Sequence, residues 1–134
     1  MLNHLAVFVA AVAAFLVGAL WYSPLLLGKP YMKLRGMSAA AMAEMKMPPW
    51  KIGAEFLRCL VTAYVLARFV VLLGVADWNG AVLLGLWVWL GFYATLYLGA
   101  VIHENLPLKL YAIHAGDALV KTLLMAVILG VWRR

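Results

Sequence analysis

The chain has 134 residues, enough for one domain, of which 68% are hydrophobic and only 12% are charged. Water-soluble proteins average about 45–50% apolar and about 25% charged residues, so this composition excludes an ordinary soluble fold and indicates a membrane protein. The formal net charge of +6 is concentrated mainly in one short loop. No basic and aromatic pattern on a polar face accompanies it, so nucleic acid is not an expected partner.

Four apolar runs are each long enough to cross the hydrocarbon core of a bilayer as a helix, which takes about 20 residues. In chain order they cover about residues 2–27, 50–73, 80–102 and 108–132. The first run lacks a positively charged start and a clear cleavage site, so we expect it to be retained and not removed as a signal peptide. The sequence therefore predicts an all-α membrane protein, residues 1–134 forming one compact bundle of four transmembrane helices.

The polar segment at about residues 28–49 contains five methionines, which are Met32, Met37, Met42, Met45 and Met47. Thioether sulfur atoms are soft ligands that suit Cu(I). An amphipathic helix that begins with an N-cap at Ser38 and carries Met42 and Met45 at i,i+3 explains the pattern as well. Because basic residues flank the methionines, we favour a short cytoplasmic amphipathic segment against anionic headgroups, and we expect no bound metal or cofactor.

The distribution of basic residues predicts the orientation. Six of them lie in the first and third connections, namely Lys29, Lys33, Arg35, Lys46, Lys51 and Lys109. On the other side only Arg133 and Arg134 follow the last run, and no Lys or Arg precedes the first. Positive loops face the cytoplasm. We therefore expect both termini outside the cytoplasm, in a multi-pass protein whose immediate partner is the lipid bilayer; the resemblance described below implies the bacterial cytoplasmic (inner) membrane.

Small residues recur every four positions on two of the predicted helices. The first helix carries Ala6, Ala10, Ala14 and Gly18, and the third carries Gly91, Thr95 and Gly99. Such stripes let helix backbones approach closely within a membrane. They predict tight packing, within the chain or with further copies or other membrane subunits. Cys59 is the only cysteine, and in its apolar surroundings we expect it to be a packing residue.

Two of the predicted helices also carry ionisable residues, which cost about 2.5–3.5 kcal/mol each at the centre of a membrane helix and therefore usually face other helices. The second helix carries Glu55, Arg58 and Thr62 on one arc, and the fourth carries His114, Asp117 and Lys121 on one arc. Each helix therefore has one polar stripe on an otherwise apolar surface.

Counting residues from the membrane entry of each helix predicts which of these groups meet. Arg58 falls at the depth of Asp117, and Glu55 at the depth of His114, within about 1.5 Å. Lys121 follows Asp117 by four residues, so the same carboxylate can pair with it.

Two interpretations of the polar stripes remain open: ionic links that fix the two helices together, or a polar pathway or binding site for an anion or a proton. Arg68 points away from both stripes and lies closer to the far end, where it can extend toward water or pair with Asp77.

Two segments resemble a known bacterial membrane family. Gly18-Ala-Leu-Trp-Tyr-Ser-Pro-Leu25, followed by Lys29 and Tyr31, is similar to the start of domain of unknown function 1761. Glu104-Asn-Leu-Pro-Leu-Lys-Leu-Tyr-Ala-Ile-His-Ala-Gly116 is similar to its second recurrent block. The resemblance covers essentially the whole chain and implies the four-helix fold, but no function. The family often has Asn at the position of His114 and an aromatic residue at that of Asp117, so these two residues are departures from its pattern.

Two functional hypotheses follow. The first is a non-catalytic membrane protein that assembles through helix packing, as a homo-oligomer or as an accessory subunit of a larger complex. The alternative is a small oligomeric transporter or channel whose polar stripe lines a path. An enzyme is not expected, because His103-Glu104 is accompanied by no HExxH, GxSxG or paired-carboxylate spacing.

Overall fold

The computed structural model describes residues 2–21 and 49–132, and every regular element in these two stretches is a helix. In chain order they are α1 (His4–Trp21), α4 (Pro49–Leu72), α5 (Trp78–Val88), the π-helical turn η1 (Trp89–Ala94), α6 (Thr95–Glu104) and α7 (Leu108–Val131). The elements α5, η1 and α6 follow one another without a break and form one 27-residue helix, Trp78–Glu104. The predicted amphipathic segment and its methionines lie outside the described residues.

Local sequence explains where the helices begin and end. The side chain of Asn3 accepts a hydrogen bond from the backbone N–H of Ala6 at 3.1 Å and caps the start of α1. Asp77 caps α5 in the same way, accepting from the N–H of Gly80 at 2.9 Å. Asn105 ends α6 in the left-handed conformation at φ 55°, which lets the N–H of Leu106 reach the carbonyl of Ala100. The connections between the second and third runs and between the third and fourth runs are therefore short turns.

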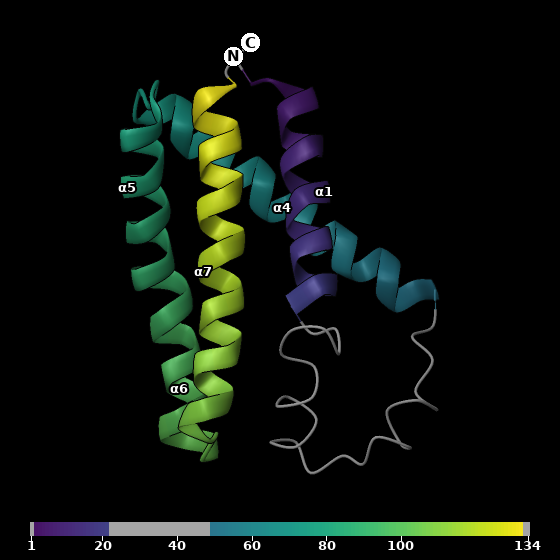
Figure 1. Cartoon of the computed structure of the whole chain (residues 1–134), viewed down its shortest axis with the longest axis vertical. Coiled ribbons are helices and arrows are strands. Elements are labelled where there is room, and N and C mark those ends of the chain that lie inside the picture. The colour runs from purple at the N-terminus through teal and green to yellow at the C-terminus, as the bar shows by residue number, and fades with distance from the viewer. Residues whose placement is uncertain (1, 22–48, 133–134) are drawn as a thin grey trace.

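Helix α7 lies at the centre of the arrangement and contacts α1, α4 and α5 (Figure 1). The helices α1, α7 and α5–α6 run roughly along one axis, whereas α4 passes obliquely behind α7 and α1. The two ends of the described chain meet, because the side chain of Asn3 donates to the carbonyl of Trp132 at 3.5 Å. The prediction of four helices is met, but α4 does not lie alongside the others as in a regular four-helix bundle.

The core is built largely from small side chains. On α1, the stripe residues Ala6, Ala10 and Ala14 are completely buried, and on α4 Cys59 and Ala63 are buried in the same cluster. These residues bring α1 close to its neighbours, as small residues do between membrane helices.

The close contact between α5 and α7 uses glycines that the sequence analysis did not single out. A Cβ atom on Gly130 would stand 2.8 Å from Cβ of Ala81, and one on Gly85 would stand 3.0 Å from the Leu123 side chain. By contrast, among the described residues no atom of another helix lies within 4 Å of a Cβ placed on Gly91 or Gly99. Within residues 2–21 and 49–132, these two glycines therefore do not make the predicted close contact.

The wide turn η1 explains why the packing face of this helix differs from the prediction. In a regular α-helix, the residue seven positions after Gly85 would share its face, and that residue is Phe92. Phe92 is instead 65% exposed, and Ala94 is buried. A π-helical turn holds more residues than an α-helical one, so the face that meets α7 shifts along the sequence.

Three of the helices are long and apolar enough to cross a membrane, namely His4–Trp21, Trp78–Glu104 and Leu108–Val131. The helix α4, which corresponds to the predicted run at residues 50–73, is not among these three. It has the length, but Lys51, Glu55, Arg58 and Arg68 interrupt its apolar sequence. Because charged side chains are costly in lipid, the position of α4 in a membrane depends on contacts with the neighbouring helices.

Candidate functional site

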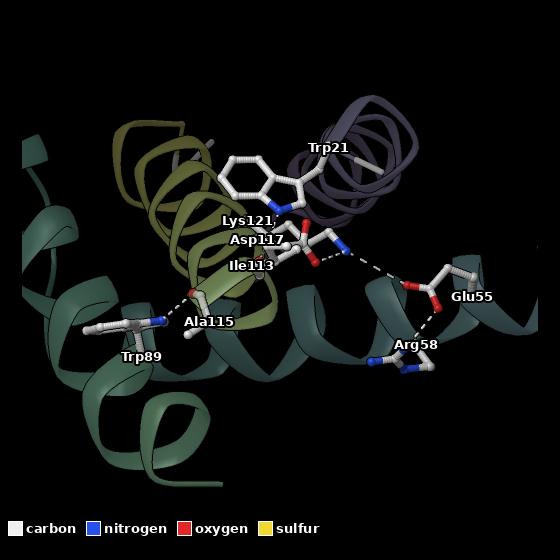
Figure 2. Close-up of polar contacts among 8 residues, drawn as sticks. All are labelled: Trp21, Glu55, Arg58, Trp89, Ile113, Ala115, Asp117 and Lys121. Atoms are coloured by element: carbon white, nitrogen blue, oxygen red, sulfur yellow. Dashed lines mark hydrogen bonds and ion pairs between the residues drawn. The ribbon is translucent and has the colours of Figure 1, made fainter. Parts of the chain in front are cut away.

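Four ionisable side chains from α4 and α7 form a connected group, here called the ionic cluster: Glu55, Arg58, Asp117 and Lys121 (Figure 2). Within α7, Lys121 Nζ lies 3.0 Å from Asp117 Oδ2, which is the pair that the four-residue spacing predicts. The same ammonium lies 3.9 Å from Glu55 Oε1 on α4. Glu55 Oε2 in turn accepts a hydrogen bond from Arg58 Nη1 at 2.6 Å.

The predicted pair of Arg58 with Asp117 is wrong. Arg58 pairs with Glu55 on its own helix, and the link between the two helices is the contact of Lys121 with Glu55. The prediction counted depth along two parallel helices, whereas α4 crosses α7 obliquely (Figure 1), so equal counts do not bring side chains together. The proposed contact of Glu55 with His114 stays a prediction.

Arg68 and Asp77 do not form the predicted pair. Asp77 is used as the cap of α5, and Arg68 is exposed on α4. Thr62, the third residue of the predicted stripe on α4, donates its hydroxyl to the carbonyl of Arg58 at 3.0 Å. It therefore contributes to the cluster through the backbone of its own helix.

A cavity of about 600 Å³ adjoins the ionic cluster, and we call it the polar cavity. Among the described residues it is lined by Phe15, Gly18, Ala19, Ile52, Glu55, Arg58, Tyr97, His114, Asp117 and Lys121. It thus combines side chains of α1, α4, α6 and α7. Small-molecule sites in proteins commonly have volumes of about 300–1,000 Å³, so its size suits a small ligand.

The cluster leaves two buried polar atoms without a partner among the described residues. They are Oδ1 of Asp117 and Oγ1 of Thr122. Both residues also line a smaller hollow of about 50 Å³ between α4 and α7. Buried polar groups in proteins are normally hydrogen-bonded, and a hollow of this size can hold a water molecule that bonds to such atoms. The ionic groups therefore do not satisfy one another completely.

Gly18, predicted as a packing residue, makes room for the cluster. A Cβ atom at this position would stand 2.8 Å from Lys121 Nζ and 3.0 Å from its Cε. The end of the Lys121 side chain therefore lies directly against the backbone of α1. Gly18 is the last residue of the small-residue stripe on α1, and it leaves room for the charged side chain of Lys121. The three alanines before it in the stripe pack in the core.

Indole and phenol groups donate hydrogen bonds to backbone carbonyls near the cavity, and Figure 2 shows the two indoles, Trp21 and Trp89. Trp21 Nε1 donates to the carbonyl of Ile113 at 3.0 Å, and Trp89 Nε1 to that of Ala115 at 2.8 Å. The Tyr111 hydroxyl donates to the carbonyl of Ala94 in η1 at 3.0 Å. Trp21 also packs on Gly116, where a Cβ atom would stand 3.0 Å from the indole. These bonds fix α1, η1 and α7 around the cavity.

With this geometry established, comparison with known proteins gives one match. A family model described as "Protein of unknown function (DUF1761)" matches residues 5–130. The chain belongs to this family. The resemblance seen in the two sequence segments is thereby confirmed, and it extends over nearly the whole chain. No curated protein and no solved structure matches the chain.

Membership of DUF1761 assigns no role to the cavity, so the arrangement of side chains carries the functional argument. Tyr97 and Thr122 are among the site residues that the sequence did not indicate. The ring of Tyr97 stacks on His114 with centroids 5.7 Å apart. Thr122 is completely buried beside Lys121, and one hydroxyl in an apolar run gave no sign of this.

The described residues also bear on metal binding. Within residues 2–21 and 49–132, no three His, Cys, Asp or Glu side chains come together as a metal site of these residues would require. The methionines considered for Cu(I) lie outside these ranges. The expectation that the protein binds no metal stays a prediction.

Proposed function

We propose that this chain is a non-catalytic integral membrane protein that binds a small polar solute in the polar cavity, as a subunit of a transporter does. The observation that carries the proposal is the convergence of all four members of the ionic cluster on one cavity of about 600 Å³. Each charged residue costs about 2.5–3.5 kcal/mol at the centre of a membrane helix. A cavity that holds water or a polar solute offsets that cost. In such a cavity the charged side chains can bind the solute.

Incomplete pairing supports solute binding over a purely structural role. A structural ion network is most stable when every member is satisfied, because a buried polar atom without a partner costs about 1–3 kcal/mol. Here Oδ1 of Asp117, a residue that lines the polar cavity, has no partner among the described residues. In addition, the side chain of Arg58 is 72% exposed. The alternative drawn from the sequence, a polar pathway, is therefore the better supported one.

The proposal also assigns a place to α4. Its sequence is too charged for a helix surrounded by lipid, but Glu55 reaches Lys121 on α7, and Arg58 borders the polar cavity. We propose that α4 is the fourth membrane helix and that its neighbours hold it there. The oblique course of α4 in Figure 1 then opens the space beside α1.

The test is access of water to the cavity. In a Cys59→Ala background, a cysteine is placed at Ala19, which lines the cavity, and in a second variant at Leu20, which does not. Because the two positions are adjacent on α1, they lie at nearly the same depth. A charged thiol reagent that cannot cross the membrane should modify Ala19→Cys about tenfold or more faster than Leu20→Cys, because thiolates react only where water reaches them. Equal rates at the two positions would contradict a hydrated cavity.

A second candidate function, assembly with further copies of the chain, is favoured by one observation. Gly91 and Gly99 have open space where a side chain would be, and Thr95 between them donates its hydroxyl to the carbonyl of Gly91 at 2.7 Å. Small residues on a free helix face are common at contacts between membrane helices. Gly91→Leu should then lower the mass of the complex in mild detergent, with Leu83→Ala as the control on the same helix.

A further inference from the structure

We propose that the ligand of the polar cavity is a small amphipathic anion, an apolar body that carries a carboxylate or phosphate group, and that Arg58 binds the acidic group. This inference rests on the proposed function and deepens it. It follows from which charges of the ionic cluster remain available to a ligand and from the apolar side chains that share the cavity.

The negative charges of the cluster are already engaged. Asp117 is buried, its Oδ2 pairs with Lys121, and its Oδ1 is a buried atom that a ligand could reach only by entering the cluster. Glu55 is engaged as well, because its Oε2 accepts a hydrogen bond from Arg58 and its Oε1 lies 3.9 Å from Lys121 Nζ. A cationic ligand would therefore have to compete with two resident cations for every exposed carboxylate oxygen.

Arg58 is the member of the cluster that still offers its charge. Its side chain is 72% exposed, and among the described residues only its Nη1 makes a side-chain hydrogen bond. A guanidinium group has five N–H donors, arranged so that two of them can bind a carboxylate or phosphate together. Arg58 lines the polar cavity, so an acidic group on a ligand bound there suits its remaining donors.

The remaining lining suits an apolar body. Phe15, Ala19 and Ile52 line the same cavity, and Ile52 is exposed. Apolar contact of this kind holds most of a small ligand in a protein site, while a few polar groups orient it. An acidic group on Arg58 and a hydrocarbon part on these residues therefore describe one amphipathic molecule.

Glu55 has a defined part in this scheme. Its carboxylate sits between Arg58 and Lys121, as the acidic group of a ligand would, so it competes with that group from within the protein. Removal of its negative charge should strengthen the binding of an anion. A gain in affinity is informative, because a variant that merely misfolds would lose binding.

The experiment uses the full chain in nanodiscs of phosphatidylcholine and three probes with the same six-carbon body: hexanoate, hexanol and hexylammonium. We expect hexanoate to bind about tenfold or more tightly than hexanol, because charge-assisted hydrogen bonds to guanidinium are about twice as strong as neutral ones. Glu55→Gln should strengthen hexanoate binding, and Arg58→Gln should remove its advantage. Arg68→Gln, on the exposed part of the same helix and outside the cavity, is the matched control and should change nothing.

Nanodiscs that contain phosphatidylglycerol test whether the acidic group bound by Arg58 belongs to a soluble acid or to a lipid headgroup. Retention of phosphatidylglycerol by the wild type but not by Arg58→Gln, without hexanoate binding, would support the inference with a lipid as the ligand.

Binding of hexanol or hexylammonium as tight as that of hexanoate, or binding of hexanoate that does not change in Arg58→Gln, would overturn the inference. If Ala19→Cys is still accessible in that case, the proposed function stands without the anion. No binding of any probe or lipid, together with an inaccessible Ala19→Cys, would overturn both.

Discussion

The ammonium group of Lys121 lies where a side chain at residue 18 would be, because a Cβ atom on Gly18 would stand 2.8 Å from Nζ. The absence of a side chain on α1 is thus what allows a lysine from α7 to lie between Asp117 and Glu55 (Figure 2). One glycine therefore couples the packing of α1 to the arrangement of the ionic cluster.

Replacement of Gly18 by alanine should displace the end of Lys121 and weaken its contacts with both carboxylates. We expect a lower free energy of unfolding in detergent micelles for Gly18→Ala. In a Lys121→Ala background the same change should cost much less, because the atoms that it would meet are gone. Residues in direct contact typically show coupling energies of about 0.5–3 kcal/mol in such a cycle. Additive effects of the two substitutions would show that Gly18 does not position Lys121.

The close contact of α5 with α7 predicts a sharp difference among glycines of the same long helix. Gly85→Leu should lower the thermal unfolding temperature clearly, because its side chain would meet Leu123 and Ala126. Gly91→Leu should have little effect on the stability of the single chain, because nothing lies within 4 Å of its Cβ. Forcing extra volume into a packed contact typically costs about 1–3 kcal/mol. Equal losses at the two positions would mean that α5 and α7 do not meet as described.

Coupling within the ionic cluster should follow the observed pairs and not the depth count. A double-mutant cycle of Asp117→Ala with Lys121→Ala should give a measurable coupling energy. We expect this coupling energy to lie between the average of about 0.6 kcal/mol for membrane contacts and the higher values of buried pairs in soluble proteins. The matching cycle of Asp117→Ala with Arg58→Ala should give a value near zero, because Arg58 pairs with Glu55. A coupling energy for Asp117 with Arg58 that exceeds the one for Asp117 with Lys121 would instead support the pair that the sequence predicted.

The charge asymmetry predicts that both termini lie outside the cytoplasm. A reporter that is active only in the cytoplasm should be inactive when it is fused after Arg134, and active when it is inserted near Lys33 in the first connection. The opposite pattern would reverse the topology. It would also make the Met-rich segment external, where the interpretation as a Cu(I) site would need to be tested again.

Composition and periodicity were sufficient to predict the helices and the two polar stripes. The pair of Asp117 with Lys121 follows directly from helical geometry, whereas the contact of Glu55 with Lys121 joins the two predicted stripes through a pair that was not predicted. The features that were predicted are local or depend only on one helix facing another. They do not require knowledge of crossing angles.

The remaining errors come from three-dimensional relationships that spacing cannot express. The partner of Arg58 depends on the oblique course of α4, and no residue count contains that angle. Gly91 lies within η1, which shifts the face that meets α7, so among the described residues no other helix packs on this glycine. The polar cavity itself arises where α1, α4, α6 and α7 come together, so no single segment predicts it.

The wide turn η1 sets the rotational register between the two halves of the helix Trp78–Glu104. The half before it packs against α7 through Ala81 and Gly85, and the half after it carries Tyr97 into the polar cavity. Loss of one residue from Trp89–Ala94 would turn the second half by about 100° relative to the first, because that is the rotation per residue of an α-helix. Tyr97 would then leave the cavity while the α5–α7 contact stayed intact. The length of this turn therefore sets the position of Tyr97 in the cavity independently of the contact between α5 and α7.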